Sequence, residues 1–202
     1  MGITPQQFKQ LEARLTRKTR VAKPDIEQRI SATNGKHEII LGVDPSLRGT
    51  GYGVIRLEKP HHAALAQGTI SCPASWEHSR CLVLIVRTLR EIIAKHHPTV
   101  CAIEGLFFAQ NLQTALIMGE ARGASLATLA EAGLEIYELA PRKVKQAIVG
   151  FGGAQKSAVA KMVQRMLQLP EQPAPDAADA LALALAHASE SSRYNFAQPK
   201  RI

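Results

Sequence analysis

Apolar residues along the chain form short continuous or alternating runs of the kind that buried strands carry. The clearest run is Ile39-Ile40-Leu41-Gly42-Val43, which is unbroken and therefore typical of a strand buried on both faces. It ends at Asp44, and a glycine-punctuated turn separates it from the next run. The pattern predicts five strands, at residues 39–43, 52–57, 63–71, 100–103 and 135–139.

Between and after these runs, the apolar residues recur at the spacing of amphipathic helices. Helices are predicted over residues 75–96 and 111–132, from about residue 141, and over 155–169 and 176–189. Three strands followed by alternating helices and strands predict an α/β fold. We expect a mixed five-stranded sheet that is flanked by helices on both faces.

The composition is that of one ordinary domain with additional terminal segments. The 202 residues are 46% hydrophobic and 4% aromatic, which suits a helix-rich α/β core. No apolar run is long enough to span a bilayer, and the first residues lack the apolar segment of a secretion signal. The three cysteines show no metal-ligand spacing and fit reduced thiols. We therefore expect a cytoplasmic protein without membrane contact.

Positive charge is concentrated at the start of the chain. The formal net charge is +8, and residues 1–36 hold eight Lys and Arg against three acids. We expect a flexible basic extension over 1–36, a domain over 37–190 and a C-terminal tail over 191–202. A basic balance favours a polyanionic partner such as nucleic acid without identifying it. The role of the extension stays open between phosphate contacts, a partner contact and an unprocessed start.

Four acidic residues stand out by position. Asp44 and Glu104 each end a predicted strand, where open α/β sheets bind their ligands. Asp176 and Asp179 lie three residues apart on one face at the start of the last predicted helix, whose apolar continuation must pack closely on the sheet. Converging carboxylates need a neutralising cation, and oxygen-only ligands favour Mg²⁺ or Mn²⁺. Two such ions would suit phosphodiester hydrolysis.

Each of these acids also has an ordinary structural explanation. Asp176 is a good N-cap, and Asp179 suits the positive end of a helix. Glu104 could be a plain loop residue, and Asp44 before Pro45 could begin a turn. From the residues alone, the metal site and these explanations are both open.

Four segments of the chain, in order, resemble the RuvC family of bacterial Holliday-junction resolvases. Together they cover about residues 38–188, and the basic extension is not part of the pattern. The segments are Ile40 to Ile55 (ILGVDPSLRGTGYGVI), Ala102-Ile103-Glu104 with Phe107, Asn111 and Gly119-Glu120-Ala121-Arg122-Gly123, Ala140 to Gln146 with Val149-Gly150 and Gln155-Lys156-Ser157, and Asp176 to Ala182.

The resemblance implies an RNase H-like fold and a structure-selective endonuclease that resolves Holliday junctions by paired symmetric nicks, in recombination and DNA repair. It implies a homodimer on four-way junction DNA, branch-migration motor proteins as partners and a nucleoid-associated place in the bacterial cytoplasm. The family's catalytic and metal-binding acids fall on Asp44, Glu104, Asp176 and Asp179. Two Mg²⁺ ions per active site, with Mn²⁺ as a substitute, would support hydrolysis to 5′-phosphate and 3′-hydroxyl ends.

DNA-binding residues follow from the same resemblance. The family's basic contacts fall on Lys145 and Lys156, and its stacking aromatic falls on Phe107, although Phe107 could also belong to a core pair with Phe108. Two further basic residues are expected to bind phosphate unspecifically or to be solvated surface charges: Arg142 and Lys143.

The predicted helix over 111–132 is our expected dimer contact, because its small residues permit close approach. Burial of that small face inside one monomer would leave the same sequence pattern. The contact therefore rests on the pattern alone at this point.

Two other functions fit parts of the sequence. The turn at Gly49–Gly53 after Asp44 also resembles the phosphate loop of sugar- and acetate-kinase-like ATPases, but such kinases need two similar domains. A non-catalytic module that binds branched DNA would keep the fold. The complete set of four acids argues against that second alternative.

Overall fold

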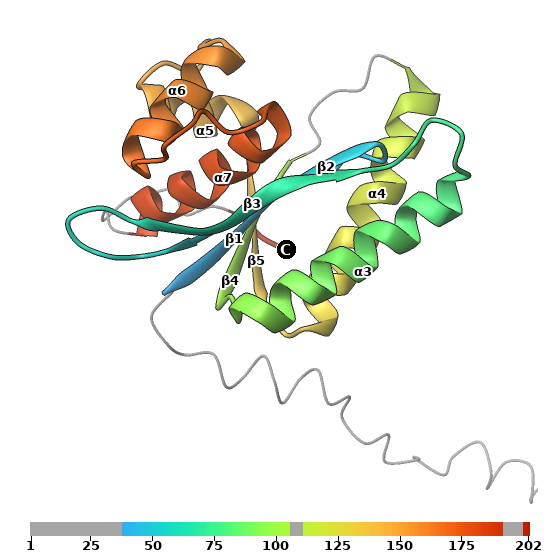
Figure 1. Cartoon of the computed structure of the whole chain (residues 1–202). Helices are drawn as coiled ribbons and strands as arrows, with labels where there is room; N and C mark the ends of the chain where they lie inside the picture. Colours follow the sequence, from blue (N-terminus) through green and yellow to red (C-terminus); the bar gives the residue numbers. More distant parts are fainter. Residues whose placement is uncertain (1–37, 106–110, 192–199) are drawn as a thin grey trace, which may run out of the picture.

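A mixed sheet forms the centre of the computed structural model, which describes residues 38–105, 111–191 and 200–202 (Figure 1). Within that part of the chain the sheet has six strands in the order β3-β2-β1-β4-β5-β6. The strands are β1 (Ile39–Asp44), β2 (Gly49–Arg56), β3 (Ala63–Ser71), β4 (Val100–Glu104), β5 (Glu135–Leu139) and β6 (Lys200–Arg201). β1, β4 and β5 are parallel, whereas β2, β3 and β6 run antiparallel to their neighbours.

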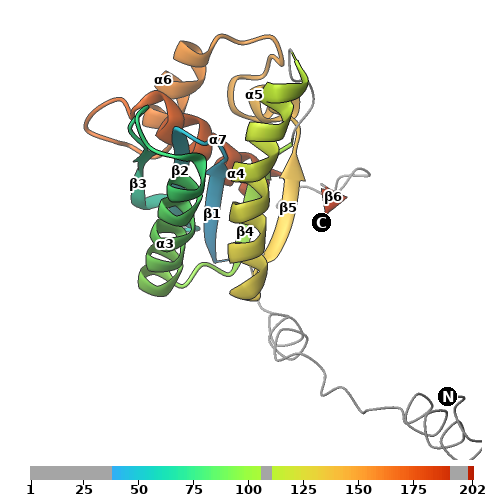
Figure 2. The same ribbon diagram turned by 90° about the vertical axis from the view of Figure 1, so that its right-hand side faces the viewer.

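Two layers of helices cover the sheet, one on each face. The helices are α3 (His78–His96), α4 (Leu112–Glu131), α5 (Pro141–Val149), α6 (Lys156–Met166) and α7 (Pro175–Ser191). α3 and α4 lie on one face, and α5, α6 and α7 lie on the other (Figure 1). Seen from the side, α3 and α4 cross in front of the strands (Figure 2). The expected α/β architecture with helices on both faces is confirmed.

The five expected strands are present, and the sixth is an addition to the prediction. β6 lies in the segment expected to be a tail, and it pairs antiparallel with the outer side of β5. An ion pair of 3.0 Å between Arg201 Nη2 and Glu135 Oε1 ties it there. A two-residue strand is too short to leave a periodic pattern that could be recognised in the sequence.

Side chains of β1 alternate between two hydrophobic cores, as the period of a strand requires. Ile40 packs into the cluster under α5 and α7, whereas Leu41 and Val43 belong to the cluster under α3 and α4. All three side chains are fully buried. This explains the continuous apolar run, since both faces of the strand are covered.

Glycines in β1 and β2 bring α7 unusually close to the sheet. A methyl group on Gly42 would lie 1.9 Å from the backbone oxygen of Ala180, and one on Gly51 would lie 2.0 Å from the backbone oxygen of Asp176. Only a residue without a side chain leaves room for the helix backbone at these two places. The close contact fixes where the first turn of α7 lies relative to the ends of β1 and β2.

The described residues bear on two expectations, those about membrane-spanning helices and about the cysteines. None of their helices has both the length and the apolar character that a membrane crossing requires. The three cysteines are free thiols and all are buried.

Candidate active site

The ends of two adjacent parallel strands place the first two acids side by side. β1 pairs with β4 in a register that sets Val43 opposite Ile103, so the following residues, Asp44 and Glu104, are neighbours at the same edge of the sheet. Both residues are half-buried. The strands that end at the two acids are neighbours, so the two residues expected at strand ends lie together.

The first turn of α7 brings the second pair of acids to the same edge. The helix begins at Pro175, so Asp176 lies inside the first turn and is not the N-cap residue. The Asp176 carboxylate lies against Gly49 at the start of β2, 3.0 Å from where a Cβ on that glycine would be. The capping explanation for Asp176 is therefore wrong, whereas its position beside the strand ends agrees with a role at the site.

The electrostatics of the site are those of acids crowded together away from water. Burial raises the pKa of Asp44, and the charge of Asp179 adds to that effect. Burial likewise raises the pKa of Glu104 to about 8, helped by the nearby charge of Asp44 and by the hydrogen bond that Glu104 donates to it. Without a metal, Glu104 thus favours its protonated form at neutral pH and donates to Asp44.

The ammonium group of Lys156 pairs with the carboxylate of Asp179. Lys156 begins α6, and its Nζ donates a hydrogen bond of 2.6 Å to Asp179 Oδ2. That hydrogen bond raises the pKa of Lys156, so the side chain stays positively charged. The family resemblance implies that Lys156 contacts DNA. The structure places this lysine beside the acids.

The donor set fits a hard divalent cation. The four side chains offer only carboxylate oxygens, which Mg²⁺ and Mn²⁺ prefer. In their present rotamers, no three His, Cys, Asp or Glu side chains of the described chain are close enough to hold one ion. The proton on Glu104 and the ammonium of Lys156 reduce the negative charge of the site instead. A bound metal would therefore replace the Glu104 proton and the Lys156 ammonium. The carboxylates would move toward each other by changing rotamer, while the backbone that holds them at one edge of the sheet stays in place.

A buried arginine supports the strand ends behind the acids, and the sequence reasoning missed it. Arg122 on α4 donates from Nη1 to the backbone oxygen of Glu104 and from Nη2 to Glu138 Oε2. Its side chain is only 10% exposed, so both contacts are shielded from water. It lies in the Gly119–Gly123 segment that resembles the nuclease family, yet no sequence rule assigns an arginine there to a strand end.

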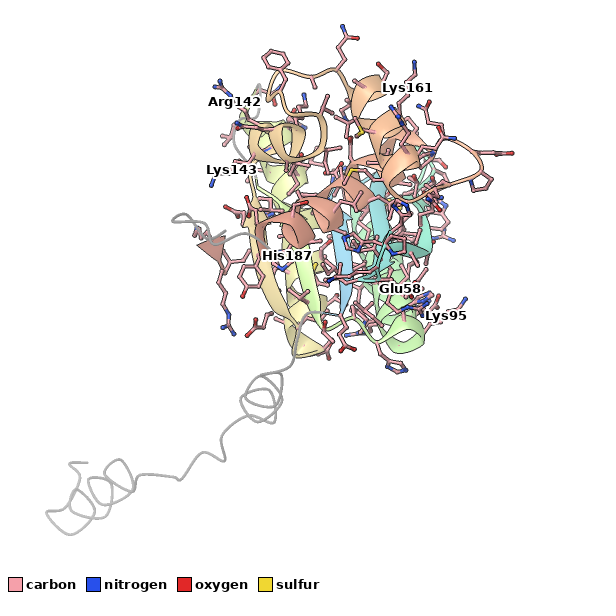
Figure 3. The ribbon with its side chains drawn as sticks, turned by 90° about the vertical axis from the view of Figure 1, so that its left-hand side faces the viewer. Glu58, Lys95, Arg142, Lys143, Lys161 and His187 are labelled. Atoms are coloured by element: carbon pink, nitrogen blue, oxygen red, sulfur yellow. The ribbon has the colours of Figure 1, made fainter. Side chains whose placement is uncertain are left out.

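Three of the four basic residues expected to bind DNA lie along α5, on the same side of the sheet as the acidic turn of α7. Arg142 and Lys143 are exposed and Lys145 is half-buried. Figure 3 shows Arg142 and Lys143 on α5 and Lys161 on α6, at the end of the molecule away from Lys95. Phe107, expected to stack on a base, lies outside the described residues.

Mg²⁺ is expected to stabilise the protein more at about pH 8.5 than at about pH 5.5. The pKa of Glu104 is raised from 4.5 to about 8 in the folded chain, so the metal-free fold loses stability as the pH rises through that window. Metal binding requires the ionised carboxylate, so the affinity for Mg²⁺ rises over the same pH range. Thermal melting with Mg²⁺ and with EDTA at both pH values measures the difference.

Glu104→Gln is the matched control, since glutamine cannot titrate and keeps nearly the same shape. The pH dependence of the Mg²⁺ effect should shrink in this variant. An equal Mg²⁺-induced rise of Tm at both pH values in the unchanged protein would contradict the assignment of Glu104 as a metal ligand.

Comparison with known proteins identifies relatives over most of the chain. The family model described as "Crossover junction endodeoxyribonuclease RuvC" matches residues 40–187. A protein of that name from Pseudomonas putida strain F1 is 46% identical over 154 residues, which is 76% of this chain and 88% of the relative. Another, from Akkermansia muciniphila, is 45% identical over 148 residues, covering 73% and 89%.

Solved structures agree with these relatives. The chain is similar to T. thermophilus RuvC in complex with a Holliday junction substrate, with a TM-score of 0.75 and 32% identity over 82% of this chain and all of that one. The yeast mitochondrial Holliday junction resolvase shares the fold at 11% identity, with a TM-score of 0.54 over 80% of this chain and 83% of that one.

Proposed function

Because the chain belongs to the RuvC family of crossover junction endodeoxyribonucleases, we propose that it cuts four-way junction DNA at the acidic site described above. The products would be two nicked duplexes with 5′-phosphate and 3′-hydroxyl ends, formed by paired symmetric cuts during recombination and DNA repair. The observation that carries the proposal is the meeting of Asp44, Glu104, Asp176 and Asp179 at one edge of the sheet.

Divalent metal binding is the second part of the proposal. The four acids would hold two Mg²⁺ ions, with Mn²⁺ as a substitute, and these ions would lower the pKa of a bound water and neutralise the leaving oxygen. The protein's own residues supply the frame for this. Arg122 holds the end of β4, which carries Glu104, and the glycines of β1 and β2 hold the first turn of α7 against the strands.

DNA binding would rest on the basic layer formed by α5 and α6. Phosphate contacts from Lys145, Arg142 and Lys143 would position the backbone without reading its sequence. Lys156 has one role in each state. In the metal-free protein it pairs with Asp179. With Asp179 holding a metal, the ammonium would be available to a phosphate near the site.

The proposed assembly is a homodimer, because a four-way junction offers two symmetric strands to cut. The outward face of α4 is the surface we assign to it. Leu112 and Leu116 are 77% and 60% exposed there, and Gly119 and Gly123 on the same face have nothing within 4 Å of an added Cβ. Ala121 and Ser125 of the same helix pack inside the monomer, whereas Gly119 and Gly123 lie on the outward face and would be left for a second copy.

We place the protein in the bacterial cytoplasm with the chromosomal DNA, and branch-migration motor proteins are the partners that this function requires. The kinase-like alternative is set aside, because the matched family is a nuclease family. The domain assignment is residues 37–190 for the nuclease, with the basic extension of 1–36 lying outside the described residues.

A synthetic four-way junction with labelled strands tests the proposal. The full chain with Mg²⁺ should nick two opposing strands near the branch, and the products should be closed by a DNA ligase, which requires the 5′-phosphate and 3′-hydroxyl ends. EDTA should stop the reaction, and Mn²⁺ should restore it. A linear duplex of the same sequence is the control and should stay intact. Tight binding without cleavage would favour the non-catalytic alternative instead.

A further inference from the structure

The turn between α5 and α6 holds Phe151 in a fixed place. Gly150 ends α5 at a φ of 84°, and its N–H donates to the backbone oxygen of Gln146 at 2.9 Å. On the other side, the backbone oxygen of Phe151 accepts a hydrogen bond of 3.1 Å from the N–H of Ala154, which closes a turn. The backbone at Phe151 is thus held by a helix end before it and a closed turn after it.

The Phe151 side chain is exposed to solvent although it is large and apolar. It is 68% exposed, and it is the one aromatic among the exposed large hydrophobic residues of the described chain. The others lie on α3, on α4 and at the C-terminal end: Val83, Leu112, Leu116 and Ile202. The exposed ring contributes little to the monomer core, and its meaning depends on the charges and the site around it.

The stretch of sequence around Phe151 carries only basic charges. Residues 140–170, which span α5, the turn and α6, hold six Lys and Arg and no Asp or Glu. The side chain of Arg142 lies over Gly152, where an added Cβ would come 2.6 Å from Arg142 Cγ. Figure 3 shows Arg142 and Lys161 along the two helices that the turn connects. A ring in this setting suits an anionic ligand that also has a flat apolar face.

The same turn leads directly into the acidic site. Lys156, whose ammonium contacts Asp179, is five positions after Phe151. The chain between them can span at most about 18 Å, which corresponds to about five base steps of a nucleic acid. A strand seated at the carboxylates therefore passes within reach of the ring.

We propose that Phe151 stacks on a nucleobase that is unpaired or partly unstacked at the branch of the DNA. Bases combine the flat π face that an exposed phenyl ring needs with the negative backbone that the surrounding lysines and arginines attract. The contact is separate from that implied for Phe107, which follows β4. It rests on the proposed junction-cutting function and adds a structure-sensing group to it.

Equilibrium binding of the full chain to a four-way junction in EDTA, which prevents cleavage, tests this contact. Phe151→Ala should weaken junction binding about tenfold, the loss of one base–aromatic stack, whereas Phe151→Trp should retain it. The dependence of binding on salt should not change, since no charge is removed. A 2-aminopurine base placed at the branch should be quenched by the unchanged protein and not by Phe151→Ala.

A linear duplex and a surface variant serve as controls. Binding to the duplex should hardly change in Phe151→Ala, because a duplex has no unstacked base. Val83→Ala, at an exposed apolar position on α3, should bind the junction as the unchanged protein does. Equal losses on junction and duplex would overturn the proposal in favour of packing on the sugar–phosphate backbone. Unchanged junction binding would overturn it too, leaving the ring for a protein partner.

Gly153 offers a test that leaves the phenylalanine in place. An added Cβ at this glycine would come 2.8 Å from Phe151 Cε1, so Gly153→Ala should push the ring aside. It should weaken junction binding in the unchanged background and have no effect in the Phe151→Ala background. Failure of the unchanged protein to bind the junction would count against the proposed function itself. Binding that is insensitive to all these changes would count against the stacking alone.

Discussion

Asp44→Asn is expected to reduce cleavage of a four-way junction by about a thousandfold or more while leaving junction binding nearly intact. A metal ion contributes several kcal/mol of transition-state stabilisation, and each 1.36 kcal/mol is a factor of ten in rate. Asparagine keeps the shape of the side chain and the oxygen that accepts the hydrogen bond from Glu104, but it loses the charge that holds the metal. Binding should persist because, in the proposed mode of binding, it depends on basic residues of α5 and α6.

The stability of this variant should move in the opposite direction from its activity. Burial raises the pKa of Asp44, which means that the folded protein holds its negative charge at a cost. Removing the charge should therefore leave Tm in EDTA unchanged or raise it. Loss of cleavage together with an unchanged or higher Tm would separate a catalytic role from a folding defect.

Glu58→Gln is the matched control for the loss of one acidic charge. Glu58 follows β2, is exposed and pairs with Arg56, and Figure 3 shows it far from the Arg142 end of the molecule. This variant should cleave at the normal rate. Normal cleavage by Asp44→Asn would refute the assignment of that carboxylate to the reaction.

Gly42→Ala is expected to cause the largest loss of stability of any single methyl group added to the sheet. The new methyl would lie 1.9 Å from the backbone oxygen of Ala180, and a helix backbone cannot turn aside as a side chain can. Overpacking of this kind costs about 3 kcal/mol or more, which lowers Tm by roughly 6–12 °C in a protein of this size. Cleavage should fall as well, because moving α7 moves Asp176 and Asp179 away from the strand ends.

The same substitution at Gly153 is the control for Gly42→Ala. There the added methyl meets the movable ring of Phe151 and no helix backbone. Its Tm should stay within about 2 °C of the unchanged protein. If both variants melted alike, the close approach of α7 to the sheet would not be the reason that glycine occupies position 42.

Much of the site was predictable because it depends on local patterns. The apolar run before Asp44 identified a buried strand, and the short run before Glu104 identified another, so both acids could be placed at strand ends. The spacing of Asp176 and Asp179 put them on one helix face. The resemblance to the nuclease family then connected the three acid-bearing segments, which physical patterns alone left unconnected.

Other features could not be predicted, because they depend on which elements meet in space. The sequence shows a basic residue at Lys156 but not its contact with Asp179, which lies 23 residues further along the chain. It shows Arg122 but not that this arginine bridges the carboxyl ends of β4 and β5. The sequence does not single out Phe151, since one phenylalanine between glycines has no periodic pattern that would indicate its exposure.

The sequence by itself determined the strands, the helices and the identity of the acids, because apolar periodicity and charge are properties of short stretches of chain. Tertiary structure alone decided that β1 and β4 are neighbours, that β6 returns to the edge of the sheet and that α7 places its two acids at the same edge as Asp44 and Glu104. The physical reason is that a carboxylate acquires its raised pKa and its partners only from groups that folding places around it.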